Sequence, residues 1–169
     1  MDKQKLIDTH KRIAPYIHRT PVLTSRLIDK KAGAALFFKC ENFQGMGAYK
    51  LRGATNAILQ LSESDREKGV VTHSSGNFAQ ALSLAAQRLG VDAHIVMPSS
   101  APKVKMEGVK AYGGKIYICE PTLTAREAEA DRIAEETGAT FMHPSNDPEV
   151  ILGQDTAALE LLLDYPDLD

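Results

Sequence analysis

The feature that most constrains this chain is a regular alternation of apolar runs and amphipathic segments from Gly69 onward. Short runs rich in Val and Ile favour strands, while the longer segments between them have helical spacing and end at glycines. Parallel strands connected in this way need right-handed crossovers, which place helices on both faces of the sheet. The sequence therefore predicts an α/β fold with a three-layer parallel sheet. We expect strands at residues 70–73, 93–97, 115–119 and 140–142, and helices at 78–89, 103–112 and 124–137.

The residues on either side of this unit carry less regular signals. Pro15 is expected to end or kink a first helix, while Ser25 and Gly33 suit the first and last positions of a short one. The elements expected here are a helix at 3–17, an extended segment at 20–23, a helix at 25–31, a buried strand at 35–40, a connector at 62–65 and a helix at 153–163.

The composition argues against several classes of function. The chain has 169 residues, of which 43% are hydrophobic and 25% are charged, and its net charge is -2. This charge gives no electrostatic reason to expect binding to nucleic acid or to an anionic membrane. There is no apolar run of about 18 residues and no apolar signal segment at the N-terminus. Cys40 and Cys119 fit no CxxC pattern, and the histidines have no metal-binding spacing. We therefore expect a cytoplasmic protein with free thiols and without a metal site.

The first candidate site is a loop with two glycines that leads into a helix near Lys50. Apolar residues follow this lysine at helical spacing: Leu51, Ala54, Ile58 and Leu61. Apolar neighbours and the positive end of the helix dipole both disfavour an ammonium group at this position. Lys50 is therefore a candidate amine nucleophile for a carbonyl. A solvated lysine in the first turn of a helix fits the same spacing and is the more common arrangement.

The second candidate site is a turn of small residues at 74–77, directly after the strand expected at 70–73. Ligands of parallel α/β sheets bind beyond the carboxyl ends of the strands. Such a turn exposes backbone N–H groups at the start of the next helix, where a carboxylate can bind. Ordinary helix capping by Ser or Asn explains the same residues without a ligand. The lysines at 103, 105, 110 and 115 are interpreted as a solvated helix face.

Two separated motifs resemble those of the fold type II pyridoxal-phosphate enzymes, and among them the serine/threonine dehydratases and serine racemases. The first motif runs from Glu41 to Ala54, and the second is the turn at 74–77. The segments Thr20-Pro21-Val22-Leu23 and His143-Pro144-Ser145-Asn146 are similar as well. The resemblance covers essentially the whole chain and implies that it corresponds to an N-terminal half, without the glycine-rich loop that binds the cofactor phosphate. It also implies three regions: part of a large domain at 1–60, a small α/β domain at 61–145, and the start of the returning large domain at 146–169.

The resemblance implies a role for each residue of the two motifs. Lys50 would bind pyridoxal 5'-phosphate as a Schiff base, and Tyr49 would flank the cofactor ring. Asn77 would donate a hydrogen bond to the phenolic oxygen of the cofactor. Ser75 would act as an acid or base on the face opposite Lys50. The residues that would hold the substrate carboxylate are Ser74, Ser75, Gly76, Asn77 and Phe78.

The activity implied by the resemblance is that of a dehydratase (ammonia-lyase) or racemase. Its substrate would be a small serine- or threonine-like amino acid, and its full-length form would be a homodimer. Phe78 stands where the family usually has a histidine, and Ala48 stands where it usually has a serine-like residue, so the substrate stays open. Two alternatives also stay open. One is a non-catalytic fragment that self-associates or needs a complementary half, and the other is a β-replacement enzyme of the cysteine synthase type.

Overall fold

A computed structural model describes residues 2–168 of the chain. The helices in this range are α1 Lys3–Ile13, α2 Arg26–Ala32, α3 Lys50–Leu59, α4 Glu63–Lys68, α5 Asn77–Leu89, α6 Lys103–Ala111, α7 Leu123–Thr137 and α8 Pro148–Asp164. The strands are β1 Val22–Leu23, β2 Phe38–Lys39, β3 Val70–His73, β4 Ala93–Pro98, β5 Lys115–Cys119 and β6 Thr140–Phe141. Two 3-10 helices, η1 Ala14–Tyr16 and η2 Glu41–Phe43, lie in the N-terminal part.

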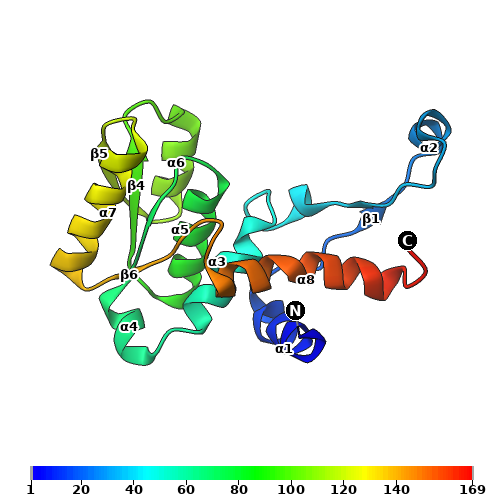
Figure 1. Ribbon diagram of the computed structural model, residues 1–169, viewed down its shortest axis with the longest axis horizontal. Helices are drawn as coiled ribbons and strands as arrows, with labels where there is room; N and C mark the ends of the chain where they lie inside the picture. Colours follow the sequence, from blue (N-terminus) through cyan, green and yellow to red (C-terminus); the bar gives the residue numbers. More distant parts are fainter. Residues whose placement is uncertain (1, 169) are drawn as a thin grey trace.

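The core of the molecule is a four-stranded parallel sheet in the order β5-β4-β3-β6. Side chains alternate across it, so that Val70 and Ile95 pack on one face, and Val71 and Val96 pack on the other. Helices α3, α5 and α6 contribute to the core on the first face, and α7 covers the second (Figure 1). The predicted three-layer α/β fold is therefore confirmed.

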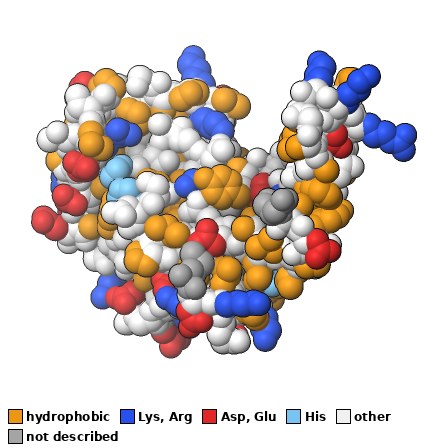
Figure 2. Space-filling model, turned by 45° about the vertical axis from the view of Figure 1, so that its right-hand side comes forward, with side chains coloured by type: hydrophobic (Ala, Val, Ile, Leu, Met, Phe, Trp, Pro, Cys, Tyr) orange, Lys and Arg blue, Asp and Glu red, His pale blue; other side chains and the backbone are white. Residues whose placement is uncertain are grey.

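A second part of the molecule is built from α1, α3 and α8, which pack together beside the sheet layers. Strands β1 and β2 form a two-stranded antiparallel ribbon that extends away from this helical layer and carries α2 at its tip (Figure 1). Apolar side chains gather around this arm on the face shown in Figure 2. The large exposed apolar residues of the arm and of the end of α8 are Leu23, Leu27, Ile28, Phe38, Leu162 and Leu163.

Helices α3 and α8 approach each other through a pair of glycines. A Cβ atom added to Gly53 would lie 2.5 Å from the carbonyl oxygen of Val150, and one added to Gly153 would lie 2.5 Å from the carbonyl oxygen of Arg52. No side chain fits at such distances, so each helix depends on glycine in the other for this contact. The contact also brings Gln154 beside the first turn of α3.

Most of the expected elements are present, and local signals set their ends. Ser25 caps α2, and Gly33, Gly90 and Gly138 end their helices in the left-handed conformation. The first helix ends at Ile13, just before the kink expected at Pro15.

Three expectations are wrong. The strand expected at 35–40 is reduced to Phe38–Lys39, and Phe38 is 41% exposed, because β2 pairs only with the two-residue β1 in an open ribbon. The connector expected at 62–65 begins α4, whose first turn Ser62 caps. The last helix begins at Pro148, after the N-cap Asp147, rather than at 153. The expected divisions after residues 60 and 145 fall in the connections between α3 and α4 and between β6 and α8, and the assignment of domains to them stays a prediction.

The glycine contact leads to a stability prediction. Gly153→Ala should lower the free energy of unfolding by about 3 kcal/mol, because the methyl group has only backbone and the buried Asn56 side chain to displace. Gly108→Ala is the matched control, since its methyl group would meet the flexible end of Gln80. The control should change stability by no more than about 1 kcal/mol, in the stabilising direction that alanine favours in a helix. Urea unfolding of both variants measures the difference, and equal stability would contradict the packing argument.

Candidate active site

Lys50 is the first residue of α3, and its side chain is half-buried. Its Nζ donates to the carbonyl oxygen of Pro144 at 2.8 Å and to Oε1 of Gln154 at 3.1 Å. The same nitrogen lies 5.2 Å from the centre of the Tyr49 ring, which is 42% exposed. The amine is therefore held in one place by two oxygens from distant parts of the chain, with an aromatic ring beside it.

The turn at 74–77 follows the carboxyl end of β3, as expected. The Ser74 N–H donates to the carbonyl oxygen of Val96, and the Gly76 N–H donates to the Ser74 hydroxyl at 3.4 Å. A Cβ atom on Gly76 would meet nothing within 4 Å, so the turn borders open space. Phe78 is only 2% exposed and its side chain belongs to the hydrophobic core, so only its backbone N–H can serve a ligand.

The helices that carry the candidate residues have unusual first turns. Within residues 2–168, side chains cap the starts of α1, α2, α4, α7 and α8. The starts of α3, α5 and α6, at Tyr49, Gly76 and Pro102, have no side-chain cap. A helix without a cap leaves its first N–H groups available to water or to an anionic ligand. The three uncapped helices are α3, which begins at Lys50, α5, which begins at Asn77, and α6, which carries Lys105.

The Asn77 side chain is oriented by a lysine of the neighbouring helix. Nζ of Lys105 donates to Oδ1 of Asn77 at 2.8 Å. Because a lysine can only donate, the amide oxygen must face it, and the amide NH₂ group is left to donate elsewhere. Lys105 belongs to the lysine run interpreted from sequence as a solvated helix face, and the structure adds this hydrogen bond to Asn77 at the exposed surface.

The segment after β6 connects the two candidate sites. The Thr72 hydroxyl donates to the carbonyl oxygen of Met142, next to the point where β3 ends. The rings of His73 and His143 lie 6.0 Å apart in an edge-to-face arrangement. Pro144, the next residue, then accepts the hydrogen bond from Lys50. Lys50 and the end of β3, which leads into the 74–77 turn, thus both contact this one segment at the carboxyl edge of the parallel sheet.

His73 is the last residue of β3 and is 7% exposed. Burial lowers its pKa, and the positive charge of Arg126 lowers it further. The ring is therefore kept neutral near the turn at pH 7.

A fully buried arginine holds the start of α3 in place. Arg52 has no solvent exposure, and its guanidinium makes two hydrogen bonds of 2.8 Å to each of Glu41 and Glu160. Lys39 and His10 also bond to Glu160, at 2.6 Å and 3.0 Å. Two carboxylates thus balance two cations, and the cluster joins α1, β2, η2, α3 and α8. Burial opposes the charge on the guanidinium, but both carboxylates raise the pKa of Arg52 above its ordinary value.

Burial alone would raise the pKa of Glu160, but hydrogen bonds from Arg52, Lys39 and His10 outweigh it and lower the pKa to about 2. In the unfolded chain this carboxyl has an ordinary pKa of 4.5. The ionised form therefore stabilises the fold above about pH 4.5, and this contribution is lost as the pH falls toward 2. A shift of this size corresponds to about 3 kcal/mol.

This titration can be tested with Glu160→Gln. At pH 7 the variant should unfold about 3 kcal/mol more easily than the parent chain, because Arg52 loses a buried partner. The difference should shrink by more than half between pH 5 and pH 3, where Glu160 of the parent chain begins to bind a proton on unfolding. Glu67→Gln, at an exposed position, serves as the control. Urea unfolding at several pH values measures the effect, and a difference independent of pH would contradict the assignment.

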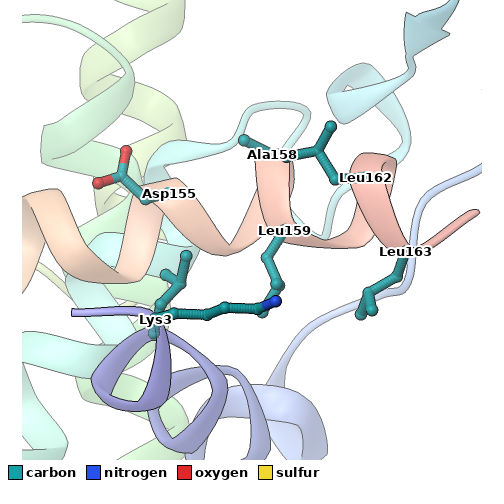
Figure 3. Close-up of a pocket in the computed structure, with 7 residues that line it drawn as sticks. Lys3, Asp155, Ala158, Leu159, Leu162 and Leu163 are labelled. Carbon is teal, nitrogen blue, oxygen red and sulfur yellow. The ribbon is translucent and has the colours of Figure 1, made fainter. Parts of the chain in front are cut away.

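Another hollow of the surface lies away from Lys50. A groove of about 580 Å³ runs between α1 and α8, lined mainly by leucine and alanine side chains. Figure 3 shows the aliphatic part of Lys3 lying along it below Leu159, while the Asp155 carboxylate points away from Lys3. Its lining is otherwise apolar, and Lys3 and Asp155 do not converge on one point to orient a small ligand, so we do not place the chemistry there. In the described range, no three His, Cys, Asp or Glu side chains cluster as metal ligands would, and no helix is long and apolar enough to cross a bilayer.

Sequence reasoning found some of these residues and missed others. Lys50, Tyr49 and the turn at 74–77 lie where the sequence predicts, although the roles assigned to them stay predictions. Gln154 was missed because it is 104 positions from Lys50 and no local pattern marks it. The role of Arg52 was missed as well, since an apolar helical stripe predicts one buried face, whereas α3 is buried from Leu51 to Ile58 on all sides.

Comparisons with known proteins agree with the two motifs. Residues 13–169 match the family described as pyridoxal-phosphate dependent enzymes. Serine racemase of Arabidopsis thaliana is 52% identical over 162 residues, which cover 96% of this chain and 49% of that protein. The β-hydroxyaspartate dehydratase of Paracoccus denitrificans is 49% identical over 166 residues, which cover 98% of this chain and 53% of that protein.

A solved structure, that of maize serine racemase, superposes with a TM-score of 0.97 at 50% identity and covers 99% of this chain and 51% of that one. The chain spans about half the length of the curated relatives that it matches. The resemblance predicted from sequence is confirmed, and with it the fold. The chain belongs to the family of pyridoxal-phosphate dependent enzymes.

Proposed function

We propose that this chain provides the lysine and the substrate-binding turn of a pyridoxal-phosphate-dependent racemase or dehydratase for serine- or threonine-like amino acids. The observation that carries the proposal is the amine of Lys50, held at the uncapped start of α3. The segment that holds it also contacts Thr72 and His73, the last two residues of the strand that leads into the 74–77 turn. An amine and an anion-binding helix start at one sheet edge match the two ends of an amino-acid substrate on an aldehyde cofactor.

The residues present fit pyridoxal phosphate by the chemistry of their donor groups. Lys50 supplies the amine that would hold the cofactor aldehyde, and the exposed Tyr49 ring is available to flank the cofactor ring. The Asn77 amide, turned by Lys105, presents its NH₂ group as a donor for the phenolic oxygen. When bound there, the cofactor would supply an electron sink that stabilises negative charge at the α-carbon of the substrate.

The first task of the chain is to place the substrate. The uncapped N–H groups at the start of α5 would bind its carboxylate, with the hydroxyls of Ser74 and Ser75 beside them. Gly76 leaves the approach open, and the side chain of Phe78 fills the core below. His73 stays neutral there because of burial and neighbouring positive charge, which lower its pKa.

The second task is to move protons at the α-carbon. Once substrate has taken its place on the cofactor, the free Lys50 amine would act as the base on one face. The oxygens of Pro144 and Gln154 fix the position of its Nζ beforehand. Ser75 would return a proton from the opposite face, which inverts the α-carbon. If the β-hydroxyl instead takes a proton and leaves as water, the unsaturated product would be hydrolysed by water to a keto acid and ammonia.

The relatives support a substrate of this class. Two of the most similar proteins are named serine racemase and β-hydroxyaspartate dehydratase, and both names describe amino acids with a hydroxyl group on the β-carbon. The departures at Ala48 and Phe78 that the resemblance implies leave the choice among such substrates open. A β-replacement enzyme of the cysteine synthase type is less well supported.

A second candidate function is non-catalytic, and it rests on exposed apolar surface. Leu162 and Leu163 at the end of α8 are 51% and 60% exposed, and Leu27 on the arm is 65% exposed. Apolar groups that gather in this way favour association with another polypeptide. We propose that this surface packs against a second copy or a complementary chain, and the homodimer expected for the family is one such assembly.

Absorbance spectroscopy with pyridoxal phosphate tests the first proposal. The chain should develop the band of a lysine-bound cofactor, and borohydride reduction followed by peptide mapping should place the adduct on Lys50. The band should be absent in Lys50→Ala and unchanged in Lys103→Ala, which alters an exposed lysine. A stable band with release of a keto acid from serine would exclude the non-catalytic function. If no band forms at high cofactor concentration, catalysis by this chain alone is excluded.

The two faces assigned to Lys50 and Ser75 lead to a separate prediction. In protein loaded with pyridoxal phosphate, Ser75→Ala should reduce racemisation of serine by about 100-fold, the lower range for loss of a general acid or base. Elimination should fall much less, because it needs proton removal by Lys50 and protonation of the departing hydroxyl, but no return of a proton to the α-carbon by Ser75. Ser64→Ala, at an exposed position of α4, is the control. Chiral chromatography and keto-acid release measure the two rates, and equal losses would rule out the assignment to opposite faces.

A further inference from the structure

The segment that carries Pro144 is shaped by the side chain of His143. Nδ1 of His143 lies 3.1 Å from the Ser145 backbone nitrogen and 2.8 Å from the Asn146 backbone nitrogen, and both N–H groups donate to it. A backbone N–H can only donate, so Nδ1 must present its lone pair, and the ring proton must be on Nε2. One ring nitrogen thus closes a tight turn around Pro144.

This turn determines where the Pro144 carbonyl points. Pro144 has no N–H group, so its own backbone cannot donate a hydrogen bond that would hold the turn. The turn is anchored on one side by the bond from Thr72 to the Met142 carbonyl. On the other side, the two bonds to His143 draw the chain back over the ring. The carbonyl between these anchors is the oxygen that Lys50 meets at 2.8 Å.

We propose that His143 is a positioning residue for Lys50, and that it acts through the Pro144 carbonyl by using Nδ1 as the acceptor for the Ser145 and Asn146 N–H groups. The inference rests on the proposed function in one respect, which is the reason why the Lys50 amine should need a fixed position. The Lys50 amine needs a defined position before it can react with an aldehyde. The hydrogen bond to Gln154 alone would leave the long lysine side chain free to rotate. His143 itself makes no contact with the reacting atoms in this proposal.

A packing role for the ring would give different results in a matched pair of variants. The His143 ring also lies edge-to-face with His73 and with Phe141, at 6.0 Å and 6.3 Å. His143→Phe keeps an aromatic ring in this cluster and removes the acceptor. His143→Asn removes the ring, but its Oδ1 takes the place of Nδ1 at the same number of bonds from the backbone. If the ring serves only for packing, His143→Phe should behave like the parent chain. If His143 positions Lys50, His143→Asn should behave like the parent chain instead.

The experiment uses the full chain without cofactor. Trace acetylation with acetic anhydride, read by mass spectrometry, gives the reactivity of the Lys50 amine relative to the exposed Lys103 in the same molecule. This ratio should rise about fivefold in His143→Phe, the change expected when one hydrogen bond to the amine is lost. In His143→Asn the ratio should stay within about twofold of the parent value, which is a smaller change than the loss of one hydrogen bond would cause. An unchanged ratio in His143→Phe, or equal rises in both variants, overturns the proposal.

Hydrogen exchange of the parent chain gives a second test that needs no variant. The Ser145 and Asn146 amides should be protected, and this protection should be lost in His143→Phe and kept in His143→Asn. If both amides of the parent chain exchange at the rate of free amides, His143 does not hold the turn and the proposal fails. Neither measurement involves pyridoxal phosphate, so the positioning role can stand if no cofactor band forms, and it can fail while the band is present.

Discussion

The architecture depends on a single buried guanidinium. Arg52 lies at the centre of the helical layer with no exposure to solvent, and it bonds to carboxylates from η2 and from α8. A buried charge without partners is very unfavourable, and removing one member of such a pair typically costs about 3–5 kcal/mol. The chain must therefore bring Glu41 and Glu160 to Arg52 at the same time. This requirement fixes the position of the first turn of α3 and of the whole of α8.

The candidate site follows from that arrangement. Lys50 precedes Arg52 by two residues, so the anchored helix start determines where the lysine begins. The Gly53 and Gly153 contact then lets α8 approach closely enough for Gln154 to reach the amine. The parallel sheet contributes the rest, since the segment leaving β6 passes the end of β3 and supplies the Pro144 carbonyl. The amine is thus positioned by tertiary contacts on both sides.

Local signals in the sequence were sufficient for most of the fold. Periodic apolar residues and glycine stops predicted β3, β4, β5 and the helices between them, because these signals act within a few residues of where they occur. The two motifs identified the lysine, the turn and the family. Local reasoning failed at residues 35–40, where an apolar run became a short exposed strand with a single partner. Whether such a run is buried is decided by what packs over it, and the run itself contains no information about that.

The sequence by itself determined the α/β fold, and it also marked Lys50 and the small-residue turn as candidates, because these features follow from the spacing and type of neighbouring residues. Only the tertiary structure decided how the lysine is held. The oxygens of Pro144 and Gln154 lie 94 and 104 positions from Lys50, and Glu160 lies 108 positions from Arg52. Hydrogen bonds between residues so far apart have no periodicity to detect. They exist only when the folded layers bring donors and acceptors within 3 Å or so, at which point burial makes each of them necessary.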